Sequence, residues 1–203
     1  LKRRGYVNER YANINSGYSN MPTELQLVSY DVHILKMVIR DKDEHKLRDI
    51  LTCGISLNAC NKYGESLVHK VCKSGQDRLL QVFLDCGADI QISDGAGRTP
   101  MHDACYGSKP SFKTFEILLK ADPYLIHMMD SGGALPLTYV KREQYAAWNT
   151  FLASILDVYW NRRDVLSRVQ GPPPLALVKA NSRPAPDPEQ PLSYELAALV
   201  SSG

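Results

Sequence analysis

The 203-residue chain carries 24 Lys and Arg against 22 Asp and Glu, so its formal net charge is only +2. No part of it has the density of basic residues needed to bind a phosphate backbone, and it has no run of about 18 apolar residues, so we expect neither a nucleic-acid partner nor membrane insertion. Its five cysteines include no Cys-x-x-Cys pair, which argues against a disulfide framework or zinc ribbon and favours reduced thiols in an intracellular, cytoplasmic or nuclear protein.

The N-terminal segment 1–28 begins with 22 residues that are rich in Asn, Tyr, Ser, Arg and Gly and show no apolar periodicity. Such a segment buries too little surface to offset its ordering entropy, so it is predicted to be a disordered N-terminal tail. A helix is then expected to begin near Asp31, whose carboxylate could cap the first turn. A second helix is expected from Asp43, and Gly54 is expected to end it in a left-handed conformation.

The middle of the chain contains one motif written twice. The stretch from Gly64 to Cys72 reads GESLVHKVC, and the stretch from Gly97 to Cys105 reads GRTPMHDAC. Residues 87–89, between the two copies, read Gly-Ala-Asp. The offset from one copy to the next is about 33 residues, and this combination of period and motifs resembles the ankyrin repeat.

A helical apolar pattern also returns at spacings of about 33 to 35 residues, beginning at Leu47, Leu80, Phe115 and Trp148. The resemblance therefore implies an all-α ankyrin-repeat solenoid of about four stacked helix-turn-helix units with hairpin-like loops, flanked by disordered tails. The domain is expected to span residues 29–169. Its two end units lack parts of the motif, as capping repeats do, and an apolar run from Tyr145 predicts a long last helix that acts as a C-terminal cap.

The segment 170–203 holds seven of the twelve prolines, which disfavours packed secondary structure. It is predicted to be a Pro-rich disordered tail.

Two His-x-x-Cys pairs, beginning at His69 and His102, could suggest a zinc site or a thiol nucleophile. Equivalent positions of stacked helices lie roughly 8 to 10 Å apart, however, which is too far for one metal ion to gather all four ligands. The resemblance implies instead that both histidines form structural hydrogen bonds between adjacent repeats. No phosphate loop or dinucleotide motif appears, so we expect no catalytic residue, metal, cofactor or small-molecule substrate.

The resemblance points to a protein partner of unknown identity, bound through the hairpin tips and the inner helices. The expected protein-binding residues are Tyr63, Glu65, Lys70, Lys73, Arg98, Asp103, Tyr106, Tyr139 and Arg142. The function expected is that of a non-catalytic adaptor, scaffold or regulatory module. The alternative is the recognition domain of a larger enzyme or regulator, with which a first residue of Leu rather than Met is compatible. A more distant alternative is a thiol or metal enzyme that uses the His-x-x-Cys pairs.

Overall fold

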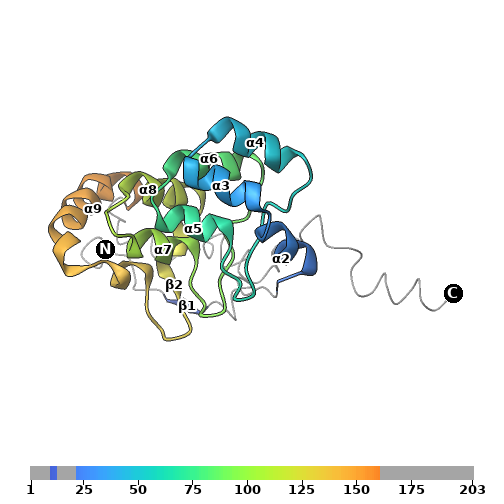
Figure 1. Ribbon diagram of the computed structural model, residues 1–203. Helices are drawn as coiled ribbons and strands as arrows, with labels where there is room; N and C mark the ends of the chain where they lie inside the picture. Colours follow the sequence, from blue (N-terminus) through green and yellow to red (C-terminus); the bar gives the residue numbers. More distant parts are fainter. Residues whose placement is uncertain (1–9, 13–21, 161–203) are drawn as a thin grey trace, which may run out of the picture.

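The computed structural model describes residues 10–12 and 22–160, and these form a helical solenoid (Figure 1). The helices and strands in chain order are β1 (Tyr11–Ala12), α2 (Glu24–Tyr30), α3 (His33–Asp41), α4 (Glu44–Thr52), α5 (Leu67–Lys73), α6 (Asp77–Asp85), α7 (Pro100–Tyr106), α8 (Phe112–Ala121), the 3-10 helix η2 (Pro123–His127), β2 (Met128–Met129), the 3-10 helices η3 (Pro136–Tyr139) and η4 (Arg142–Gln144), and α9 (Tyr145–Tyr159).

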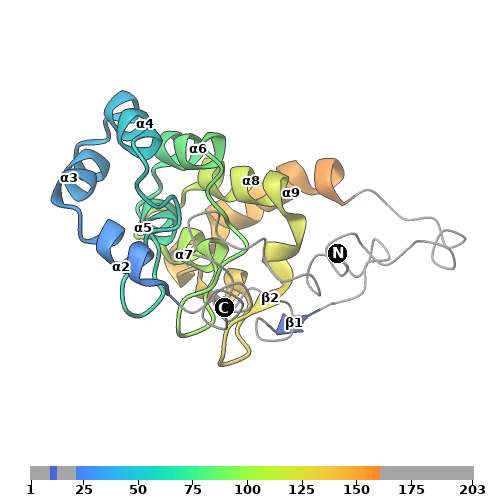
Figure 2. The same cartoon turned by 90° about the vertical axis from the view of Figure 1, so that its right-hand side faces the viewer.

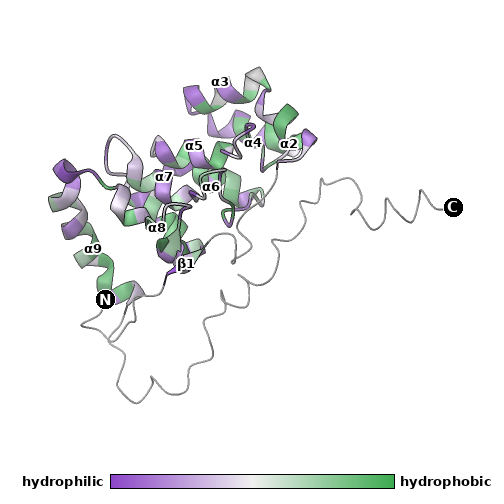
Figure 3. Cartoon of the chain, turned by 90° about the horizontal axis from the view of Figure 1, so that it is seen from below, coloured by the Kyte–Doolittle hydropathy of each residue, from purple (hydrophilic) through white to green (hydrophobic). Residues whose placement is uncertain are grey.

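The helices stack in two rows. In the inner row α5 packs against α7 and α7 against η3, while in the outer row α4 packs against α6 and α6 against α8. Figure 2 shows the outer row as an arc from α4 to α9, with the loops extending from the inner row on the other side. Hydrophobic and hydrophilic residues alternate along the helices (Figure 3), as expected where one face of each helix packs inward. One continuous core therefore runs through the stack, with Leu47, Leu80 and Phe115 at repeat-equivalent buried positions.

The ends of the helices follow from the sequence. The Asp43 carboxylate accepts a hydrogen bond from the backbone N–H of Lys46 and thereby caps α4. Gly54 follows this helix with a φ of +87°, the left-handed conformation predicted for it. The prediction of a helix from Asp43 to a glycine stop is confirmed.

The N-terminal boundary of the domain differs from the prediction. Residues 24–30 form α2, which begins with a reciprocal capping box between Thr23 and Gln26. This helix is held to the first unit because the Cys60 N–H donates to the carbonyl oxygen of Gln26 and the Ser56 N–H donates to the Ser29 hydroxyl. Hydrogen bonds to residues distant in sequence therefore offset the conformational entropy lost when residues 24–28 become ordered. The assignment of these residues to a tail was wrong.

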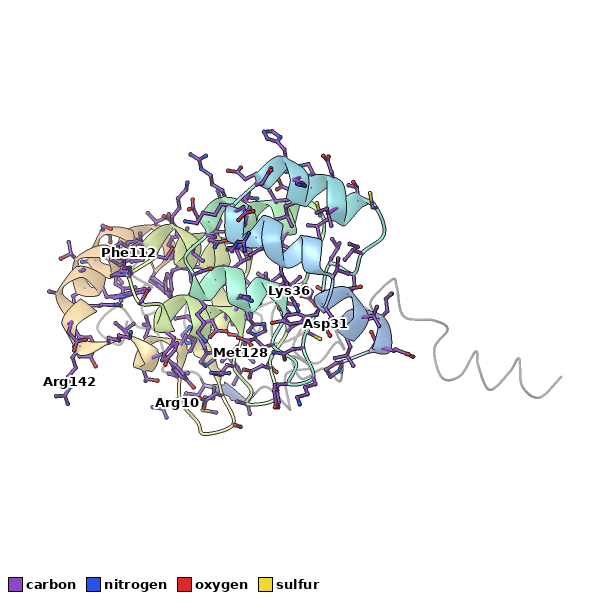
Figure 4. The ribbon with its side chains drawn as sticks, in the orientation of Figure 1. Arg10, Asp31, Lys36, Phe112, Met128 and Arg142 are labelled. Atoms are coloured by element: carbon purple, nitrogen blue, oxygen red, sulfur yellow. The ribbon has the colours of Figure 1, made fainter. Side chains whose placement is uncertain are left out.

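Asp31 was expected to cap the following helix, but it ends α2 instead. Its carboxylate lies 2.9 Å from the Lys36 ammonium, and the two side chains are labelled in Figure 4. The tail segments 1–9, 13–21 and 170–203 lie outside the described residues, and so do residues 161–169, the last part of the predicted domain.

A second N-terminal contact was not foreseen. Strand β1 pairs in parallel with β2, with Tyr11 opposite Met128 and Ala12 opposite Met129. The Tyr11 ring also lies edge-on to Tyr124, with 6.1 Å between the ring centroids. The N-terminal part of the chain thus contacts two separate parts of the described stack, the first unit through α2 and the third through β1.

The fourth unit departs from the pattern at its inner helix. Leu135 stands at the position of the capping Ser or Thr and makes no side-chain cap, so that only the single 3-10 turn η3 forms. The outer helix α9 is long, as predicted, and reaches Tyr159. It closes the core with aromatic side chains, because Trp148 lies edge-on to Phe112 and Phe115, with ring centroids 5.3 and 5.0 Å away. Phe112 is labelled in Figure 4.

Candidate protein-binding face

The loops that precede the inner helices share one hydrogen-bonded turn. Asn61, Asp94 and Asp130 occupy equivalent positions, and the side-chain Oδ1 of each accepts from two backbone N–H groups, two and four residues further on. Neighbouring tips are also joined to each other. The Gly95 N–H donates to the Tyr63 carbonyl at 2.7 Å, and the Ser131 N–H donates to the Ala96 carbonyl at 2.9 Å. The tips therefore form a fixed row rather than independent loops.

Two buried histidines connect each inner helix to the next unit. His69 Nε2 lies 2.9 Å from the carbonyl oxygen of Arg98, and His102 Nε2 lies 3.2 Å from that of Ala134. A carbonyl can only accept, so each ring carries its proton on Nε2. The Nδ1 atoms then accept, from Ser66 and Thr99 respectively. The predicted structural role of both histidines is confirmed.

Burial keeps these rings neutral. It lowers the pKa of His69, and it lowers the pKa of His102 to about 4, although the hydrogen bond to the Ala134 carbonyl opposes the change. With Nδ1 accepting and Nε2 donating, neither ring has a lone pair free for a metal. The thiols of Cys72 and Cys105 are buried, and burial raises the pKa of both, so these are inert side chains rather than nucleophiles. Among the described residues no group of three or more His, Cys, Asp or Glu could hold a metal ion.

The structure brings several of the predicted binding residues together on the inner row. Tyr106 on α7 is 45% exposed, and its ring lies edge-on to that of Tyr139, with centroids 6.1 Å apart. Two ammonium groups lie over the Tyr106 ring, Lys73 at 5.3 Å and Lys141 at 5.9 Å from its centroid. We call the set Lys73, Tyr106, Tyr139 and Lys141 the inner-face patch.

Tyr139 is the fixed member of this patch. Its hydroxyl donates to the Asp130 carboxylate at 2.5 Å, and its ring lies edge-on to His102. Burial, together with the hydrogen bond to the charged Asp130, raises the pKa of Tyr139 to about 12. The ring is therefore held by the tip turn on one side and by the bridging histidine on the other.

The remaining predicted residues have different surroundings. Tyr63 is 67% exposed at a tip, with the Lys62 ammonium 5.1 Å from its ring centroid. Lys70 on α5 is exposed, and Arg142 on η4 points away from the stack in Figure 4. Glu65 is half-buried, and its carboxylate accepts from the side-chain amide of Asn61.

Arg98 and Asp103 are less available to a partner than expected. The Arg98 guanidinium donates twice to the Asp94 carboxylate, from Nε at 2.8 Å and from Nη2 at 2.5 Å. Asp103 is only 1% exposed, so its assignment to the free surface of α7 was wrong. Its Oδ2 accepts no hydrogen bond within the described part of the chain. Burial raises the pKa of Asp103 to about 7, although the nearby charges of Lys73 and Arg98 act in the opposite direction.

Residues 35–128 match a family model described as "Ankyrin repeats (3 copies)". This range runs from α3 to β2 and contains both bridging histidines. Residues 35–128 of this chain are therefore ankyrin repeats.

Curated proteins similar to the chain carry the same kind of repeats. Protein phosphatase 1 regulatory subunit 27 from Homo sapiens is 33% identical over 92 residues, which are 45% of this chain and 60% of the relative. SMC5-SMC6 complex localization factor protein 1 from Bos taurus is 28% identical over 128 residues, 46% of this chain and 12% of the relative. The ADP-ribosylation factor GTPase-activating protein AGD2 from Arabidopsis thaliana is 36% identical over 72 residues, 36% of this chain and 9% of the relative. The chain thus matches less than two thirds of the length of each of these relatives.

Ankyrin repeats are protein–protein interaction modules and are generally non-catalytic. No helix in the described part of this chain has both the length and the apolar character required to cross a membrane. Reasoning from sequence missed Lys141, which joins the inner-face patch from the fourth unit, beyond the matched residues 35–128. The available signal was its separation from Tyr106 along the chain, which is close to one repeat period.

Proposed function

We propose that this chain is a non-catalytic adaptor, scaffold or regulatory module that binds a protein partner through its hairpin tips and inner helices. The observation that carries the proposal is the inner-face patch. It presents a partly exposed aromatic ring between two ammonium groups, on a backbone fixed by the linked tips and the histidine bridges. Tyrosine on such a rigid surface is among the residues enriched at the centres of protein interfaces.

The dimensions of the stack support this surface. Neighbouring units place equivalent positions roughly 10 Å apart, so that three units can present a face of the order of 800 Å², the standard size for one partner. None of the five cysteines, all of which lie within the described residues, forms a disulfide, which suits the reducing cell interior that we propose as the location of the protein.

The second candidate is the recognition domain of a larger enzyme or regulator. Two observations favour it: the matches cover only 12% of the localization factor and 9% of the GTPase-activating protein. The two candidates differ in whether the complete reading frame encodes a catalytic domain, and sequencing the full-length transcript distinguishes them.

Replacement of exposed tyrosines tests the binding face. In the double variant Tyr63→Ala/Tyr106→Ala, proteins that co-purify with the tagged wild-type chain should bind at least about 2 kcal/mol more weakly, roughly 30-fold. The matched control is Tyr145→Ala/Val158→Ala, which truncates two residues on α9 that are 50% and 70% exposed. Quantitative mass spectrometry of the captured proteins gives the readout.

The outcome depends on which variant loses the partner. Loss of the partner in Tyr63→Ala/Tyr106→Ala alone supports the proposed site at the tips and inner helices. Loss in the α9 control alone would place the interface on the outer row and contradict the proposal. Circular dichroism melting of each variant separates loss of binding from loss of fold.

A further inference from the structure

The charges of the two faces are arranged differently. Across the outer row, cations and carboxylates of neighbouring units pair with one another. These pairs are Arg48 with Asp85 at 2.9 Å, Arg78 with Glu44 at 3.4 Å, and Lys113 with Asp77 at 2.6 Å. The outer face thus neutralises much of its own charge.

The cations of the inner face are not paired in this way. Its cations Lys70, Lys73, Lys141 and Arg142 form no ion pair with any carboxylate of the described residues. Of the nearby carboxylates, Asp94 accepts from Arg98 and Asp130 accepts from Tyr139, while Asp103 is buried in the stack and is only 1% exposed. The inner-face patch therefore presents, on both sides of an aromatic ring, ammonium groups that form no ion pair within the described residues.

From this complementarity we propose that the inner-face patch binds an acidic peptide segment of the protein partner, with carboxylates placed against Lys73 and Lys141 across the ring of Tyr106. The inference rests on the proposed protein-binding function and specifies the chemistry of the partner. Paired charges of this kind set specificity and association rate, while the ring supplies apolar contact.

Binding at the inner-face patch should be coupled to the protonation of Asp103. This residue lies beneath the patch on α7 and is faced by Lys73 and Cys72 of α5, Arg98 and Asp94 of the preceding tip, and Glu65 of the tip before. An acidic segment that engages Lys73 weakens the stabilisation of the Asp103 carboxylate and adds negative charge nearby. Binding should therefore favour protonated Asp103, so that affinity falls as the pH rises through about 7, the pKa of this carboxyl in the free protein.

A display library of random dodecapeptides, panned against the full 203-residue chain, tests the proposal. Enriched peptides should contain an excess of Asp and Glu. In fluorescence anisotropy, the best of them should lose at least about tenfold affinity for Lys73→Glu/Lys141→Glu, because like charges then face each other. The matched control Lys46→Glu/Lys120→Glu makes the same change in net charge on exposed positions of α4 and α8, and affinity for it should stay within about twofold.

The outcomes separate this inference from the proposed function. Neutral or basic peptides that still depend on Tyr106, as judged with Tyr106→Ala, would overturn the acidic partner and leave the binding face intact. Peptides indifferent to Tyr106→Ala and to both lysine changes would overturn both. Tighter binding of a short single-stranded DNA than of the acidic peptide would assign the patch to phosphates and also overturn the inference.

The proton linkage has its own readout. Peptide affinity should fall roughly two- to fivefold between pH 6 and pH 8 in the wild type and should remain flat in Asp103→Asn, in which the amide cannot ionise. A flat wild-type profile would contradict the role of Asp103.

Discussion

His102→Ala should weaken the fold by removing one bridge between units. The side chain is 0% exposed and makes contacts on both sides, with Thr99 through Nδ1 and with Ala134 through Nε2. The Ala134 carbonyl keeps a second donor, the Asp130 N–H at 3.0 Å, whereas the Thr99 N–H loses its acceptor inside the core. Two hydrogen bonds at about 1 kcal/mol each, with a further cost for the orphaned N–H, give a loss of about 2 to 3 kcal/mol at pH 7.

The loss should depend on pH with a defined sign. The folded pKa of His102 is about 4, below the value of about 6.5 expected in the unfolded chain, so protons bind preferentially to the unfolded state. The stability that neutral His102 contributes is therefore present above pH 6.5 and is lost as the pH falls toward 4. At pH 5 this term is about 2 kcal/mol, and the difference between wild type and variant should shrink by about that amount. Asp103 titrates with the opposite sign, which is why the difference, and not the wild-type curve, isolates His102.

Urea denaturation followed by circular dichroism at pH 7 and pH 5 measures both quantities. His45→Ala, an exposed histidine on α4, is the matched control and should change stability by less than about 0.5 kcal/mol. A change of similar size in the His102 variant at pH 7 would refute the bridging role. A large difference that is independent of pH would show that the imidazole is not held neutral in the fold.

Three further predictions follow from particular contacts. Trp148→Ala should cost about 3 to 5 kcal/mol in urea denaturation, because it empties the aromatic contact between α8 and α9, whereas Val158→Ala on the exposed side of α9 should be nearly neutral. Gly75→Ala should lower the melting temperature more than Gly54→Ala. Both glycines have positive φ, but only at Gly75 would an added Cβ meet a serine side chain, at 2.9 Å. Equal effects would show that backbone strain alone determines the loss. In a thiol titration with an aromatic disulfide, the exposed Cys53 should react fastest and the three buried thiols only on unfolding, and rapid reaction of a buried thiol would contradict their assignment as inert.

The sequence by itself determined the repeating unit. The period of about 33 residues, the paired Ser66/His69 and Thr99/His102 motifs and the capping residue Asp43 each specify local hydrogen bonds that form wherever the unit folds. The histidine bridges were predictable for the same reason, because stacked copies of one unit place equivalent groups at a constant offset.

The tertiary structure alone decided which segments and side chains the stack covers. Residues 24–28 were assigned to the N-terminal tail, and only the backbone contacts to Cys60 and Ser56 show why α2 is ordered. Likewise, the inner-helix pattern leaves Asp103 free in principle, yet the packing of α5 and η3 against α7 buries it and brings Lys141 over Tyr106. The burial of a side chain and the charges around it depend on neighbours that come from several units. A pattern that describes one unit at a time cannot contain them, and for this reason the inner-face patch, which we propose as the binding site, could be recognised only in the assembled stack.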